Sequence, residues 1–136
     1  MTWDTTDLAD YNDIIVQDGV FAYNYTASGT IYKGQAVALV PGMDNTVMVC
    51  TSDAGVCDSI GLATMGATNG KQISIAGPGN ICWACVDAAE AVNTPLYGDT
   101  DGVYDAAPGN ATRVSAIIVS LPALVTTAYV GKVLVL

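Results

Sequence analysis

Short apolar runs that end in turn residues follow one another along most of the chain, and this pattern limits the fold more than any other feature. The runs GQAVALV and TVMVC flank PGMDN, and the runs KQISIA and ICWACV flank GPGN. Short runs bounded by Gly, Pro and Asn predict β-strands. The dipeptides Asn69-Gly70 and Asp101-Gly102 predict hairpin turns, because these residue types tolerate positive φ. We therefore expect an all-β fold, a small barrel or sandwich of about eight to ten short strands.

The residue types that fill exposed helix faces are scarce, which also argues against a helical protein. Glu occurs once and Lys three times in the 136 residues. The stretch 88–92 (AAEAV) is the one helix-like patch, and it is only about a turn long. A chain of this length has room for one good hydrophobic core. We expect a single β domain over residues 19–136.

Residues 1–18 differ from the rest, and we expect them to form an extended N-terminal arm. The segment contains no cation and five aspartates: Asp4, Asp7, Asp10, Asp13 and Asp18. Its charges repel one another, so the arm is expected to become ordered against another surface. The side chains expected to bind that partner are Trp3, Leu8, Tyr11 and Ile14, with Trp3 as the anchor. The alternatives are a frayed terminus and a first edge strand of the same barrel.

The charge balance excludes one class of partner. Four cations against 13 acids give a formal net charge of −9. Such a chain cannot build the basic patch that neutralises phosphates, so we expect no nucleic-acid partner. The N-terminal sequence has no basic region followed by an apolar one, and no long apolar run follows it. We therefore expect no membrane partner and folding in a reducing cytoplasm.

The stretch LYGDTDGVYD, residues 96–105, has two interpretations. As a calcium loop it would use Asp99 and Asp101 as its first and third ligand positions. Val103, Tyr104 and Asn110 then occupy positions that need an oxygen ligand, a glycine and a glutamate. The sequence instead favours a hairpin tip at Asp101-Gly102 that holds no cation.

No residue set in the sequence favours catalysis, a cofactor or a metal. The chain has no histidine, which removes the common general base and the commonest metal ligand. The carboxylate pairs Asp87/Glu90 and Asp99/Asp101 are ordinary for surface turns. The CWAC run, Cys82 to Cys85, lies in an apolar strand-like segment, which predicts buried free thiols. Cys50 and Cys57 could form a disulfide only in an oxidising compartment. We expect no enzyme activity.

The order of several motifs is similar to that in a known family. GTIYKGQAVALVPG is followed by SIGLATMGATNGKQISIAGPGN, then by TPLYGDTDGVYD, and finally by RVSAIIVS and VGKVLVL. This order, over residues 29–136, resembles the small capsid-decoration or cement proteins of tailed viruses, in particular the lineage described as a small domain of unknown function. The CWAC run and the acidic arm depart from the family pattern.

The resemblance implies a mostly β protein without catalysis that assembles as trimers or other small clusters. It implies a place on the outer surface of the viral capsid, where the protein ties neighbouring major capsid proteins together. Such a protein is made in the host cytoplasm and ends in the virion. Its partners would be the major capsid protein and further copies of itself.

Two other classes of function stay open. One is a self-assembling subunit of a viral tail tube or of an extracellular filament, for which a donated N-terminal segment also makes sense. The other is a cation-dependent carbohydrate-binding module. Its candidate residues are Asp99, Asp101 and Asp105 together with the tyrosines of the strand-like segments, Tyr23, Tyr25 and Tyr32.

Overall fold

The computed structural model describes residues 14–17, 22–125 and 128–136. In these ranges the chain forms strands and one short 3-10 turn but no α-helix, which confirms the predicted all-β class. The elements are β1 (Ile15–Gln17), β2 (Ala22–Ala27), β3 (Ala36–Leu39), β4 (Thr46–Val49), β5 (Gly61–Ala63), β6 (Gln72–Ala76), β7 (Ile81–Val86), β8 (Pro95–Gly98), η1 (Thr100–Gly102), β9 (Tyr104–Asp105), β10 (Ala116–Ile118), β11 (Ala123–Leu124) and β12 (Tyr129–Val135). The strands outnumber the eight to ten expected, because residues 95–124 contain several strands of only two to four residues.

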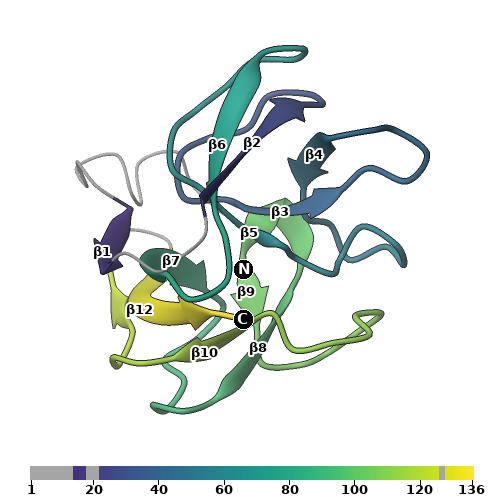
Figure 1. Cartoon of the computed structure of the whole chain (residues 1–136). Helices are drawn as coiled ribbons and strands as arrows, with labels where there is room; N and C mark the ends of the chain where they lie inside the picture. Colours follow the sequence, from purple (N-terminus) through teal and green to yellow (C-terminus); the bar gives the residue numbers. More distant parts are fainter. Residues whose placement is uncertain (1–13, 18–21, 126–127) are drawn as a thin grey trace.

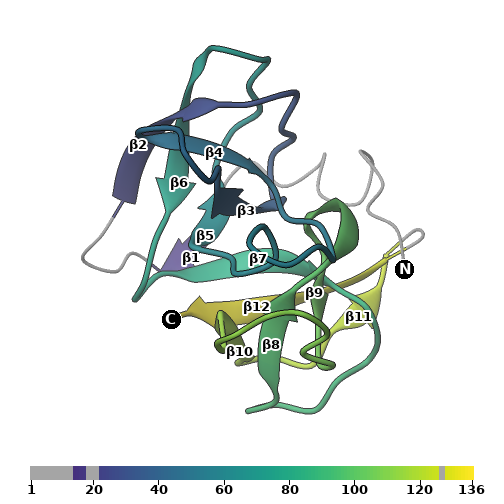
Figure 2. The same cartoon turned by 90° about the vertical axis from the view of Figure 1, so that its right-hand side faces the viewer.

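The strands build two small barrels, one above the other (Figure 1). The first barrel has the closed order β2-β4-β3-β5-β6. The second is part of a sheet with the order β1-β7-β9-β8-β10-β12-β11, and it closes because β12 also pairs with β7. Strand β7 lies at the level where the two barrels meet (Figure 2). Strands β3 and β4 form an antiparallel hairpin, and so do β5 and β6, which flank the predicted Asn69-Gly70 turn.

The C-terminal strand holds the second barrel together. Strand β12 pairs with β7 over six residue pairs and also with β10 and β11. Its residues Val130, Val133 and Val135 are buried. Strand β12 is therefore a paired inner strand.

The two barrels share a core cluster on one face of β3, and the other face of β3 lines a second core inside the first barrel. Val37 points into the first barrel, where it packs with Val47 and Ile75. Its neighbours Ala36 and Ala38 belong instead to a larger cluster that contains side chains of β7, β10 and β12. Successive residues of a strand face opposite sides, so one strand can serve both cores.

The Asp-Gly segment forms the predicted hairpin, since β8 pairs with β9 antiparallel. Its loop is held against the first barrel. The side-chain Nε2 of Gln35 donates a hydrogen bond to the Asp101 carbonyl at 3.0 Å, and the Gly102 N–H donates to the Cys50 carbonyl at 3.1 Å. Gly102 is buried, so this hairpin links the barrels.

Residues 14–17, which the sequence placed in the arm, lie at the end of the sheet that forms the second barrel. Strand β1 pairs with β7, and the Trp83 N–H donates to the Ile14 carbonyl at 2.9 Å. Ile14 is only 1% exposed and belongs to the shared core. It therefore offers almost no surface to a partner. Trp3, Leu8 and Tyr11 lie outside the described residues, and their binding role stays a prediction.

The contact between the hairpin and the first barrel can be tested with two glycines. A Cβ at Gly102 would lie 2.8 Å from the Gln35 Cβ and 3.0 Å from the backbone N and O of Ala36. A Cβ at Gly109 would meet nothing within 4 Å, although both glycines have positive φ, +71° and +52°. We expect Gly102→Ala to lower the free energy of unfolding by roughly 2–4 kcal/mol. Gly109→Ala should cost about 1 kcal/mol, from its backbone conformation alone.

Urea denaturation of both variants measures the difference. Equal losses of stability for the two variants would contradict a close contact at Gly102.

Candidate functional site

Two carboxylates of the acidic hairpin, those of Asp99 and Asp105, accept hydrogen bonds from neighbouring residues. Oδ1 of Asp105 accepts a hydrogen bond from the Ala107 N–H at 2.8 Å, and Oδ1 of Asp99 accepts one from the Thr100 hydroxyl at 3.5 Å. Asp101 is in the left-handed region, with φ 59°. In the described ranges, no group of three or more His, Cys, Asp or Glu side chains is placed to hold a metal ion.

All four cysteines are buried thiols outside any disulfide, which confirms the burial predicted for the CWAC pair. Burial raises the pKa of Cys50 to about 12, against a smaller lowering effect of its hydrogen bond with Ser59. A thiol with such a pKa is almost entirely protonated at neutral pH, and the reactive form is the thiolate. These side chains therefore have the environment of core residues.

Asp87, just after β7, is the carboxyl group with the least favourable environment. Partial burial raises its pKa to about 6, and the nearby charges of Asp105 and Glu90 add to the increase. Its Oδ1 is buried and has no hydrogen-bond partner in the described part of the chain. The group therefore binds its proton more tightly in the folded protein than in the unfolded chain.

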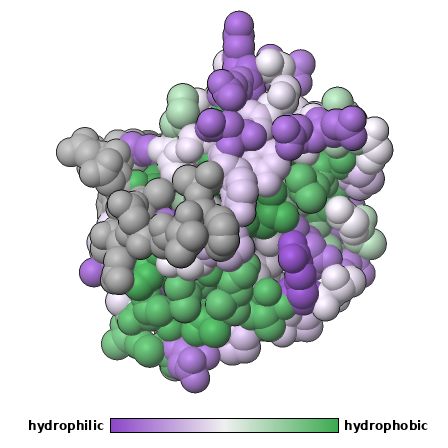
Figure 3. All heavy atoms as spheres, viewed as in Figure 1, coloured by the Kyte–Doolittle hydropathy of each residue, from purple (hydrophilic) through white to green (hydrophobic). Residues whose placement is uncertain are grey.

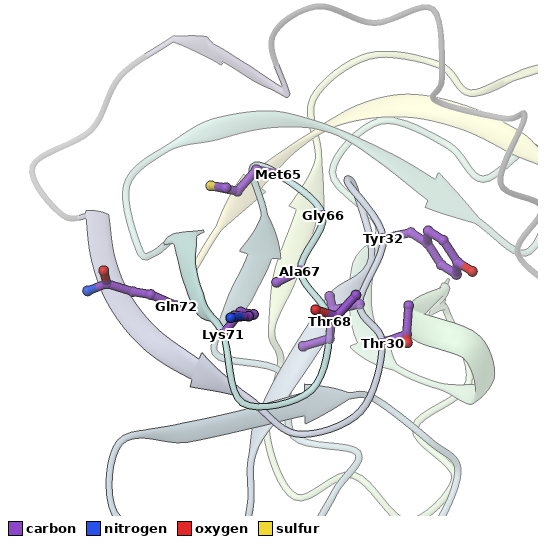
Figure 4. Close-up of a pocket in the computed structure, with 9 residues that line it drawn as sticks. Thr30, Tyr32, Met65, Gly66, Ala67, Thr68, Lys71 and Gln72 are labelled. Atoms are coloured by element: carbon purple, nitrogen blue, oxygen red, sulfur yellow. The ribbon is translucent and has the colours of Figure 1, made fainter.

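A cleft of about 420 Å³ lies beside the loop between β5 and β6 (Figure 4). The antiparallel bridge between Ile31 and Ala67 forms part of its wall. In Figure 4, the side chains of Met65, Lys71 and Gln72 lie on one side of this loop, and Tyr32 lies on the other. The lining has hydroxyl, amide and ammonium groups but no carboxylate or thiol. The described lining therefore offers polar groups for hydrogen bonding but no carboxylate or thiol for catalysis.

A second cleft, of about 230 Å³, lies where the first barrel meets the second. We call it the Arg113 cleft. Tyr23 and Tyr25 of β2 line it with their rings 6.2 Å apart, together with Ile75, Arg113 and Leu136. The sequence indicates Tyr23 and Tyr25 as candidate binding residues, but it does not indicate Arg113. The one signal for Arg113 was that it is a rare cation in an acidic chain.

Asp58 fixes the backbone that carries Arg113. Its carboxylate accepts hydrogen bonds from the Thr112 N–H at 2.8 Å, the Thr112 hydroxyl at 2.6 Å and the Arg113 N–H at 3.3 Å. Slight burial acts to raise the pKa of Asp58, but these bonds outweigh it and hold the pKa below its usual value. The loop before β10 is thereby tied to the segment before β5.

The outer surface of the second barrel is apolar over neighbouring strands. Ile117 of β10 is paired with Leu134 of β12, which is paired with Ile81 of β7, and all three are half-buried. Next to them, the Lys132 ammonium lies 5.2 Å from the centre of the Trp83 ring. We call these five residues the outer apolar face. Figure 3 shows hydrophobic residues over the half of the molecule that contains β10 and β12.

Comparisons with known proteins gave a similarity of fold. No family model matches the chain, and no curated protein matches it. Among solved structures, the chain is similar to the N base of the head fiber protein gp8.5 of bacteriophage phi29, with a TM-score of 0.56. The match covers 85% of this chain and 93% of that one, at 12% sequence identity. No helix in the described ranges has the length and apolar composition to span a bilayer.

The burial of the thiols can be tested by chemical modification. We expect a thiol reagent such as 5,5′-dithiobis(2-nitrobenzoate) to modify the native protein slowly and all four cysteines rapidly in urea, because burial blocks access of the reagent to the thiols. Rapid reaction of any thiol in the native protein would contradict the burial.

The pKa of Asp87 predicts a dependence of stability on pH. The folded state binds the proton of Asp87 up to about pH 6, whereas the ordinary pKa is 3.8. The free energy of unfolding should therefore fall as the pH rises from 3.8 to about 6, and this contribution should then stay constant. Asp87→Asn should remove this slope and raise stability at pH 7. We expect a gain of about 1 kcal/mol or less, because this group is only partly buried and solvent screens its charge.

Urea denaturation at several pH values measures the slope. Asp53→Asn, which removes the same charge from an exposed loop, is the control. A wild-type slope that persists in Asp87→Asn would show that another group causes it.

Proposed function

We propose that this chain is a structural protein of a tailed-virus particle that decorates the outer capsid surface and bridges neighbouring major capsid proteins. The observation that carries the proposal is the likeness of fold, over 93% of that chain, to the base of a phage head fiber protein. The motif order over residues 29–136 supports the same class independently, because it resembles capsid-decoration proteins.

The surface of the molecule suits binding better than chemistry. The chain contains no histidine, and the cleft of about 420 Å³ is lined without a carboxylate or thiol. The outer apolar face, in contrast, leaves three aliphatic side chains and one tryptophan half-exposed next to one another. Contiguous apolar surface on a protein often marks a site of protein–protein contact. We therefore assign the chain a binding role and no catalytic one.

Decoration gives a physical route to capsid stability. A protein that binds the assembled shell but not its separated subunits favours the assembled state by mass action. In this proposal, the chain forms a small closed oligomer, with a trimer favoured. Its outer apolar face and its N-terminal residues are the parts that attach.

The alternative of a self-assembling fibre or tube subunit has one supporting observation, because the similar structure is part of a head fiber. The two functions predict different sizes in solution. A decoration protein stays a small closed oligomer, whereas a filament subunit with an open interface continues to grow. Light scattering over a concentration series separates them.

The decoration function is tested with capsids assembled from the major capsid protein of the same genome. We expect the full chain to co-sediment with assembled capsids and to raise their melting temperature, and not to bind unassembled capsid protein. Binding to the unassembled protein alone, or to neither form, would refute decoration.

Deletion of residues 1–13 separates attachment from folding. If the segment is an arm, the variant keeps its own melting temperature but loses capture by capsids or by other copies. A large fall in the melting temperature would instead show that the segment belongs to the fold.

A further inference from the structure

Within the described ranges, strand β2 has an open hydrogen-bonding edge at Asn24. The first barrel closes between β2 and β4 through only two residue pairs, Thr26 with Thr46 and Ala27 with Val47. The Ala27 N–H points toward the β6 side, where it donates to the Lys71 carbonyl, and the Thr26 N–H points the other way, to the Asn45 carbonyl. Backbone groups alternate between the two edges of a strand. Asn24 therefore directs its N–H and C=O to the β4 side, beyond the point where the β4 pairing ends.

The exposed position of Asn24 agrees with an edge that can accept another strand. Unpaired backbone groups on a strand edge are a template for pairing with an added strand. Such an addition supplies main-chain hydrogen bonds, and its specificity comes from pockets for alternate side chains.

A pocket of this kind lies beside the edge. The Arg113 cleft is lined by Tyr23 and Tyr25, the residues on either side of Asn24. Tyr23 is 43% exposed, and Ile75, the partner of Tyr23 on β6, contributes to the lining. The cleft therefore combines aromatic surface, an aliphatic wall and one cation.

The charge of Arg113 is available to a ligand. Within the described ranges, the one hydrogen bond of its guanidinium runs from Nη2 to the Ser59 carbonyl, at 3.4 Å. The nearby carboxylate of Asp58 attracts the guanidinium electrostatically, but it accepts its hydrogen bonds from Thr112 and from the Arg113 backbone, so guanidinium N–H donors remain for a ligand. An arginine guanidinium offers two parallel N–H donors to a carboxylate. In a chain with 13 acids and four cations, this geometry suits an acidic group.

We propose that the open edge of β2 and the Arg113 cleft form a docking site for an extended acidic segment, and that residues 1–13 of a second copy of the chain occupy it. The segment has the required chemistry. It contains Asp4, Asp7, Asp10 and Asp13 and no cation, so it complements Arg113. It also contains Trp3, Leu8 and Tyr11, which complement the tyrosine-lined cleft. The proposal rests on the attachment role given above to the N-terminal residues.

Docking of this kind also gives a reason for a closed oligomer. The segment that is donated and the cleft that accepts it are different surfaces of the same chain. Each copy can then give one segment and receive another, which is a head-to-tail contact. Such contacts form a ring when the rotation between copies closes.

A charge exchange between copies tests the proposal with purified full-length protein. One variant carries Arg113→Glu, and the other carries Asp4→Lys, Asp7→Lys and Asp10→Lys. We expect each variant alone to associate with a dissociation constant at least tenfold above that of the wild type, measured by analytical ultracentrifugation. A mixture of the two should form a complex containing both chains, detected with different tags. Opposite charges then meet only between unlike copies.

Failure of the mixture to form this complex, with each chain folded, would overturn docking between copies. A chain that carries both sets of changes is a further check. If opposite charges attract only within this chain, and it stays a monomer, the segment binds the cleft of its own copy, which would also overturn docking between copies. Lys71→Glu is the matched control, because it makes the same charge change in the other cleft. It should leave association within about twofold of the wild type. Melting temperatures confirm that each variant is folded.

The hydrogen-bonding part of the site has its own test. Asn24→Pro removes the outward N–H of β2, whereas Asn24→Ala keeps it. We expect the proline variant to associate at least fivefold more weakly than the alanine variant at an equal melting temperature. Equal association of the two would remove strand addition from the proposal. These measurements need no capsid, so they can succeed or fail independently of the decoration function.

Discussion

Burial of strand β3 on both faces is the constraint on which the rest of the structure depends. Ala36 and Ala38 face the second barrel while Val37 faces the first, so one strand is a wall of both cores. Because the side chains of Ala36 and Ala38 are small, the second barrel can pack close to β3. Gly102 is needed for the same reason, because its hairpin loop packs directly on the backbone of Ala36. The two barrels therefore cannot shift relative to each other without breaking a common core.

The shared wall explains how the Arg113 cleft can be present before any partner binds. Its tyrosines come from the first barrel, and Arg113 comes from the loop before β10 of the second. The three hydrogen bonds at Asp58 hold that loop against the segment before β5. A site between two parts that are fixed relative to each other loses less conformational entropy on binding than a mobile one.

Local turn chemistry made much of the fold predictable. The Asn69-Gly70 and Asp101-Gly102 turns lie in real hairpins, and the thiols of the apolar CWAC run are buried. The division into two barrels was not predictable, because it depends on pairings between segments distant in sequence. The parallel pairs β2–β4 and β7–β9 have no local signature. The burial of Ile14 was not predictable either. Its sequence neighbours are acidic, and what buries it is a contact with β7, a strand far away in the sequence.

The scarcity of cations gives each of them a large influence on how copies can meet. A surface with 13 acids and four cations repels its own copies at long range, so non-specific association is disfavoured. Contact is then favourable mainly where an acid meets a cation or where apolar surface is buried. Lys132 lies over Trp83 within the outer apolar face, and Arg113 lies beside two tyrosines. A cation beside an aromatic ring offers both charge pairing and apolar contact at the same place. Repulsion between acidic residues elsewhere on the surface disfavours other orientations of two copies. In the docking proposed above, this combination lets copies that repel one another at long range associate in one geometry.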